Sequence, residues 1–214
     1  DMYPGVPYFM FGHSMGSFIT RMYIAKYGAD LKGATLCGTT GEWPSLDENI
    51  EMLQKLVDEG KGDESDPTLG GKLMGWMFAR CEEGVRLGNE WICDDPYVQE
   101  DHAKDPFDAF TKPTCNSAWL YFNQMMKDIT GVQWARKVPV DLPIYNIAGD
   151  QDPVGQYGTG VYQTSNWLAE TGHNVTTQLY TGYRHEIHNY EDIRDDVEQG
   201  IIWFFDTCLL EPLY

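Results

Sequence analysis

The stretch that decides the fold covers residues 7–28 and reads PYFMFGHSMGSFITRMYIAKYG. Residues 8–11 form a short apolar run, which is typical of a buried strand. Residues 12–16 then spell G-H-S-M-G, and apolar residues recur afterwards with helical spacing. The stretch therefore predicts a strand, a sharp turn that carries Ser14, and a helix from about Met15 to Tyr27.

The serine of this turn is a candidate nucleophile. The bare pattern G-x-S-x-G arises by chance in roughly one chain in ten of this length, but here a strand enters it and a helix leaves it, as in a nucleophile elbow. Gly12 and Gly16 allow the strand and the helix to approach closely. A serine hydroxyl is a poor nucleophile at neutral pH, so the chemistry requires a histidine base and an acid that orients it.

Two aspartates compete for the role of the acid. The segment YNIAGDQDPVG, residues 145–155, follows an apolar run that starts at Leu142. Asp150 and Asp152 both fall in its strand-end loop, where side chains reach a site at the carboxyl edge of a sheet. We favour Asp152; the alternative is that these carboxylates cap the turn and the helix that follows.

Five histidines compete for the role of the base. His13 lies inside the turn, on the wrong side to take the serine proton, and His102 and His173 are expected at the surface. His185 and His188 follow the last predicted strand, in YTGYRHEIHNY. We favour His185 because it comes first after the strand, where a loop can fold back over the turn.

The periodicity divides the chain into three segments. Strand and helix alternate in residues 1–38, helical patterns fill residues 39–141, and the alternation returns in residues 142–214, with helices near 159–171 and 190–209. Such a pattern predicts an α/β fold with a mostly parallel sheet and an inserted helical cap. The acidic, glycine-rich stretch 58–71 lacks the spacing of a calcium loop and is assigned no ion.

Composition restricts the partners. The 214 residues include 15 Lys and Arg against 33 Asp and Glu, a net charge of -18, which disfavours nucleic acid and anionic membranes. Five cysteines without a C-x-x-C pair suggest neither a zinc site nor a redox motif. There is no apolar stretch of about 20 residues and no signal peptide at the start of the sequence, so we expect a cytoplasmic protein that is not integral to a membrane.

The order GHSMG, GDQDPVG, YRHE resembles the α/β-hydrolase superfamily, in its serine lipase-like branch of monoacylglycerol lipases and lysophospholipases. The resemblance extends over most of the chain, including the cap segment NEWICDDPYVQEDHAKDPF. It implies Ser14 as nucleophile, Asp152 as acid, His185 as base and the Met15 N–H as an oxyanion donor. It also implies carboxylic ester hydrolysis through an acyl-enzyme, on a monoacylglycerol, lysophospholipid or small ester, without metal or other cofactor.

The cap supplies aromatic surface for an acyl chain, although for any single aromatic side chain packing in the cap core is the more common role. The candidates for substrate contact are Trp76, Trp91, Trp119 and Phe122. Two other functions stay open: an amide- or peptide-cleaving enzyme of the same fold, and a non-catalytic ligand-binding protein on this scaffold.

The serine comes early, with only thirteen residues before it. In the family that the chain resembles, several strands and a helix precede the elbow and supply the second oxyanion donor. The N-terminal part of the sheet is thus expected to be absent from this chain. We expect a separate segment or a second chain to pair with residues 6–11, because an internal strand left as an open edge invites aggregation.

Overall fold

The computed structural model describes residues 3–81, 87–107 and 113–210. Its sheet has four parallel strands in the order β1-β2-β3-β4, which is also their order in the sequence. These are β1 (Phe9–His13), β2 (Gly33–Cys37), β3 (Ile144–Gly149) and β4 (Val175–Tyr180). Every residue of β2 and β3 is buried, as expected for strands with helices on both faces.

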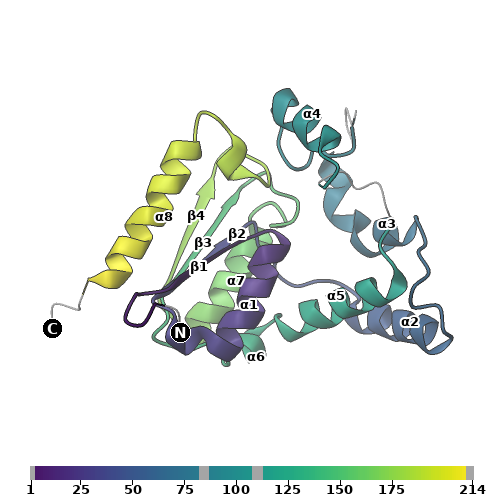
Figure 1. Cartoon of the computed structure of the whole chain (residues 1–214), viewed down its shortest axis with the longest axis horizontal. Coiled ribbons are helices and arrows are strands. Elements are labelled where there is room, and N and C mark those ends of the chain that lie inside the picture. Colours follow the sequence, from purple (N-terminus) through teal and green to yellow (C-terminus); the bar gives the residue numbers. More distant parts are fainter. Residues whose placement is uncertain (1–2, 82–86, 108–112, 211–214) are drawn as a thin grey trace.

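Helices cover both faces of the sheet. Figure 1 shows α1 (Met15–Tyr27) and α7 (Thr159–Glu170) on one face and α8 (Arg194–Leu209) on the other. Alternate strand residues supply the two cores. Ala34 and Leu36 pack with the α1 and α7 side, whereas Cys37 joins Phe204 of α8. The α/β class and the parallel sheet are confirmed.

The segment between β2 and β3 is helical and projects away from the sheet (Figure 1). It contains α2 (Leu46–Asp58), α3 (Leu69–Met74), the 3-10 helix η2 (Gly75–Cys81), α4 (Pro96–Lys104), α5 (Asn116–Asp128) and α6 (Val132–Ala135). An apolar cluster joins α2, α3 and α5. Its buried members are Leu53, Leu69, Leu73 and Leu120.

The end of this segment packs on the sheet layer. The indole of Trp134, on α6, is buried and donates to the Arg21 carbonyl at 2.8 Å. The Arg21 guanidinium is also buried, lies 4.5 Å from the Trp134 ring, and donates to the Thr39 hydroxyl, to the Thr40 carbonyl at 2.7 Å and to the Ile129 carbonyl. Burial lowers the pKa of Arg21 to about 9, so it stays protonated at neutral pH. One cation thus contacts both connections of the projecting segment.

Three local expectations differ from the structure. The helical pattern of residues 71–88 gives the short α3 followed by η2, and residues 82–86 lie outside the described residues. The closing helix begins at Arg194 rather than near Tyr190. His173 is buried instead of exposed, because its Nε2 lies within hydrogen-bond distance of the Val138 carbonyl, at 3.1 Å, and its Nδ1 of the Thr171 hydroxyl, at 2.8 Å.

The sheet has two edge strands within the described residues: β1 pairs only with β2, and β4 pairs only with β3. Apolar side chains are exposed beside the β1 edge, among them Phe11, at 45% exposure. The exposed apolar residues of α1 are Met15, Ile19, Met22, Tyr23 and Tyr27, and those of α8 are Ile202, Trp203 and Leu209. Within the described residues, the model contains no helix that is both long and apolar enough to cross a membrane.

Candidate active site

Ser14 occupies the turn between β1 and α1. Its backbone has φ 55° and ψ -126°, a conformation that non-glycine residues rarely adopt. The Ser14 N–H donates to the Cys37 carbonyl at 3.0 Å, which holds the turn against the end of β2. A Cβ atom on Gly12 would lie 2.3 Å from both the Gly16 carbonyl oxygen and the Thr20 hydroxyl, so only glycine fits there. These features are those of a nucleophile elbow.

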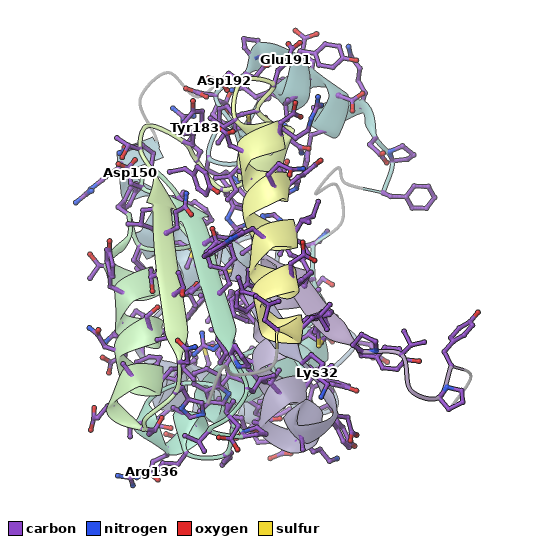
Figure 2. All side chains as sticks on the ribbon, turned by 90° about the vertical axis from the view of Figure 1, so that its left-hand side faces the viewer. Lys32, Arg136, Asp150, Tyr183, Glu191 and Asp192 are labelled. Carbon is purple, nitrogen blue, oxygen red and sulfur yellow. The ribbon has the colours of Figure 1, made fainter. Side chains whose placement is uncertain are left out.

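Asp152 hydrogen-bonds His185. Asp152 is fully buried, and its Oδ1 accepts from the His185 Nδ1–H at 2.9 Å and from the Val154 N–H at 2.8 Å. The competing Asp150 accepts instead from the Gly182 N–H at 2.8 Å and from the Gln151 amide. Figure 2 shows Asp150 near Tyr183 at the carboxyl end of the strands. Asp150 therefore closes the turn, while Asp152 orients the imidazole.

The orientation of His185 leaves one nitrogen free. A carboxylate only accepts hydrogen bonds, so Nδ1 carries the proton and the lone pair lies on Nε2. That Nε2 is buried and has no hydrogen-bond partner within the described chain. Within the described residues, no hydrogen bond joins Ser14 and His185. The ring of His13, which precedes Ser14 in the sequence, lies 4.6 Å from the His185 ring between centroids.

The loop that carries His185 is fixed from several sides. The Glu186 N–H donates to the Ile92 carbonyl at 2.9 Å, and the Gln151 N–H donates to the Tyr183 carbonyl at 2.9 Å. Gly149 packs so tightly on this loop that a Cβ atom would lie 2.0 Å from the Tyr183 oxygen. The loop therefore depends on both β3 and the projecting segment.

Sequence reasoning assigned no role to His13, yet its side chain contacts the His185 residue. Its Nε2 donates to the His185 carbonyl at 3.1 Å. Burial, with the nearby His185 and His188, lowers the pKa of His13 to about 3, so the ring stays neutral. His188 lies on the 3-10 helix η3 (Ile187–Asn189), with its ring edge-on to His13 at 4.6 Å. Only the position of His13 next to the serine hinted at this contact.

The four aromatic candidates fall into different surroundings. The Trp91 ring lies 5.2 Å from the His185 ring between centroids, tilted by 40°, and Trp91 and Trp119 line a cavity of about 400 Å³. Trp76 lines a separate, shallow groove with Trp43. Phe122 packs among aromatic rings, 5.6 Å from Trp43 and 6.2 Å from Phe18. The structure thus places only Trp91 and Trp119 in one cavity beside His185.

Glycines on α3 and at the C-terminal end of this helix line one side of the cavity. A Cβ atom on Gly71 or Gly75 would meet nothing within 4 Å, so both positions face open space. Met74 and Phe78 complete much of its apolar wall. The missing side chains therefore leave space along this wall, and the apolar wall opposite suits an apolar group.

Met15 begins α1, so its N–H has no intrahelical acceptor. An N–H at this position, directly after the elbow serine, is free to face a developing negative charge. The Met15 side chain is itself exposed and points away from the core.

Known structures share this fold. The chain is 55% identical to a highly thermostable carboxyl esterase from Bacillus coagulans, with a TM-score of 0.93, covering 98% of this chain and 67% of that one. It is 30% identical to a lipase in an open form, with a TM-score of 0.84, covering 95% of this chain and 66% of the lipase. A monoacylglycerol lipase from Paleococcus ferrophilus shares the fold at 15% identity and a TM-score of 0.65, covering 95% of this chain and 70% of that one.

A short match to a curated protein is of another kind. Over 49 residues the chain is 45% identical to a putative N-acetylmannosamine-6-phosphate 2-epimerase from Cutibacterium acnes. This stretch covers 22% of the chain and spans only 21% of that protein, so it shows no family.

The profile of the family described as "Serine aminopeptidase, S33" matches residues 1–192. This span includes the elbow, the Asp152 loop and the His185 loop. The elbow geometry, the parallel sheet and the esterase and lipase neighbours agree with that match. The chain therefore belongs to the serine aminopeptidase S33 family of α/β-hydrolases and is esterase- and lipase-like.

Proposed function

We propose that this chain carries the catalytic residues of a serine hydrolase that cleaves carboxylic esters through an acyl-enzyme. The observation that carries the proposal is the buried Asp152–His185 hydrogen bond, which leaves the His185 Nε2 unpartnered next to the elbow of Ser14. A buried nitrogen without a partner is costly. In our proposal, this nitrogen accepts the proton of the serine hydroxyl.

In the proposed mechanism, the Ser14 hydroxyl attacks the ester carbonyl while the His185 Nε2 takes its proton. Asp152 holds the imidazole in the correct tautomer and stabilises the imidazolium. His185 then protonates the departing alcohol, and the acyl group stays on Ser14. Water, activated by the same nitrogen, attacks the acyl-enzyme and releases the acid and the free serine.

The Met15 N–H is the proposed oxyanion donor. It lies at the positive end of α1, where backbone dipoles favour a negative charge. Each such donor contributes about 3 kcal/mol to stabilisation of the transition state.

The substrate class follows from the cavity between α3 and α5. Its volume of about 400 Å³ and the aromatic and apolar side chains of its wall fit an acyl chain of moderate length. Asp66, which also lines the cavity, is paired with Lys72. We therefore favour monoacylglycerol, lysophospholipid or small acyl esters. The alternative is an aminoacyl amide, which the same triad can cleave and which is the kind of substrate that the family description "Serine aminopeptidase" indicates.

Two assays on the purified chain test this proposal. A fluorophosphonate probe should label the chain, and peptide mass spectrometry should place the label on Ser14. A p-nitrophenyl butyrate assay run beside an aminoacyl p-nitroanilide assay should show a preference for the ester. The Ser14→Ala variant is the control for both. A chain that takes up no label and hydrolyses neither substrate would leave ligand binding without catalysis as the function.

A second proposal concerns the open edge of β1. We propose that another polypeptide segment, in the same protein or in a second chain, adds a strand to β1 and covers the exposed apolar faces of α1 and α8. Unpaired edge groups flanked by apolar side chains such as Phe11 and Ile19 form a template for a strand. The added segment would also supply the second oxyanion donor.

Hydrogen exchange and sedimentation measurements test whether a further strand pairs with β1. Without the added strand, the outward amides of β1 should exchange fast and the chain should self-associate. With the strand, those amides should be protected and ester turnover should rise by roughly a hundredfold, the effect of one oxyanion donor. A monodisperse chain that is fully active with these amides exchanging freely would contradict the proposal.

A further inference from the structure

A cluster of three potential metal ligands lies at the carboxyl end of the sheet, next to the proposed triad. His13 ends β1, Cys37 ends β2 and His188 lies on η3. The parallel register pairs His13 directly with Cys37, and η3 brings His188 against them. One ligand atom from each of the three lies within 4.8 Å of the other two.

Both imidazoles are in the form that binds a metal. His13 donates from Nε2 to the His185 carbonyl, so its lone pair lies on Nδ1. A ligating histidine usually donates its other ring N–H to a carbonyl or carboxylate in this way. His188 has a buried Nδ1 without a hydrogen-bond partner among the described residues. Burial lowers the pKa of both rings, which keeps them neutral at pH 7.

The third ligand is a buried thiol in an electronegative region. Burial, with the nearby Asp152 and Glu186, raises the pKa of Cys37 above its usual range. Carboxylates that oppose a thiolate favour a cation at the same place. Figure 2 shows further acidic side chains, Glu191 and Asp192, near this end of the sheet. The thiol proton would leave when a metal binds.

We propose that His13, Cys37 and His188 form a binding site for Zn²⁺, with water as the fourth ligand. Two imidazoles and one thiolate match a tetrahedral zinc site that keeps one open position. Tetrahedral ligands of zinc lie about 3.6 Å apart. The three ligand atoms, which lie within 4.8 Å of one another, have to approach one another when the ion binds.

The proposed zinc site is separate from the proposed catalytic residues but contacts them. His13 precedes Ser14 and its ring contacts the loop carbonyl of His185, so a bound ion would fix the elbow and the base relative to each other. Zn²⁺ binding does not depend on the proposed hydrolase function. If that function also holds, Zn²⁺ should slow ester turnover reversibly, and a chelator should restore it.

Calorimetric titration with Zn²⁺ and absorption spectroscopy with Co²⁺ test the site on the whole chain. We expect one equivalent of Zn²⁺ to bind and to release a proton, seen as a buffer-dependent heat. Co²⁺ should produce a thiolate-to-metal charge-transfer band. Cys37→Ser should abolish that band, and His188→Asn should weaken Zn²⁺ binding by tenfold or more.

Matched variants separate this site from other thiols and imidazoles. Cys93→Ser replaces another buried, free thiol, and His102→Asn replaces a histidine on α4. Both should leave Zn²⁺ affinity and the Co²⁺ band unchanged. Since Cys37→Ser alters a buried position, the half-buried His188 provides an independent variant. A Co²⁺ spectrum without a thiolate band, or Zn²⁺ binding that His188→Asn leaves intact, would overturn the proposal.

Discussion

The carboxyl end of the sheet and the projecting helices 46–128 are built by different means. At the sheet end, main-chain geometry fixes each group: Ser14 has a strained backbone, Gly12 and Gly149 allow backbone contacts, and Asp152 is held by a turn N–H. In the projecting helices, the packing of apolar side chains holds α2, α3 and α5 together. Substitutions at the sheet end are therefore expected to act on chemistry or folding, and substitutions in the helices on packing or, where a side chain lines the cavity, on substrate preference.

The largest effect is expected at the proposed nucleophile. Ser14→Ala should lower kcat on a p-nitrophenyl ester by about 10⁵-fold or more, and His185→Ala by nearly as much, because triad members act as a unit. His188→Ala should cost far less. Circular dichroism should show the fold of each variant intact. A larger loss for His188→Ala than for His185→Ala would reassign the base.

The next effect concerns the backbone contact inside the elbow. Gly12→Ala places a methyl group 2.3 Å from the Gly16 carbonyl, so the free energy of unfolding should fall by about 3 kcal/mol. Gly16→Ala is the matched control, because its Cβ would meet nothing within 4 Å. The control should keep its stability or gain less than about 1 kcal/mol. Urea denaturation of both variants measures the contrast, and equal losses would argue against the tight contact.

Substrate preference should change in the cavity between α3 and α5. Gly75→Leu should fill it and Trp119→Gln should make its wall polar, so kcat/KM for a laurate ester should fall about tenfold or more. Acetate turnover should change by no more than about twofold. Phe122→Ala, in the aromatic core, should instead lower stability and affect both esters alike. Identical losses on acetate and laurate for Gly75→Leu would show that the acyl chain binds elsewhere.

The smallest effect is expected at a surface ion pair of the projecting helices. Lys127 on α5 lies 2.5 Å from Asp47 on α2, and both side chains are exposed. Exposed pairs contribute little, so Lys127→Ala should leave the melting temperature unchanged within error. Leu120→Ala, in the apolar cluster of the same helices, should cost about 3 kcal/mol. A comparable loss for Lys127→Ala would mean that charge, not packing, joins these helices.

The strands, α1 and the elbow could be predicted from the sequence because local signals coincide there. Apolar runs, glycines and helical periodicity all identify residues 8–27, and the predicted bounds of α1 agree with Met15–Tyr27. The Asp152–His185 contact agrees with the favoured pair, because two strand-end loops meet at the same edge of a parallel sheet. The catalytic roles of these residues stay predictions.

Contacts between distant segments could not be predicted. The burial of His173 depends on the Val138 carbonyl, 35 positions earlier in the chain, which no local pattern reveals. The cluster of His13, Cys37 and His188 comes from strand register, since its members lie on three separate elements and share no motif spacing. Aromatic residues of the projecting helices differ in the same way: Trp119 and Phe122 lie three positions apart, yet one lines a cavity and the other packs in the core.

The buried Arg21 has a consequence for exchanging parts of this enzyme class. It meets the projecting segment where the chain leaves the sheet, at Thr39 and Thr40, and again near its return, at Ile129. Two of these three acceptors are main-chain carbonyls, which every amino acid provides. A graft that replaces residues 46–128 with another helical segment can keep this junction, because Arg21 and its three acceptors lie outside the grafted residues. The graft must also supply an acceptor for the Glu186 N–H in place of the Ile92 carbonyl.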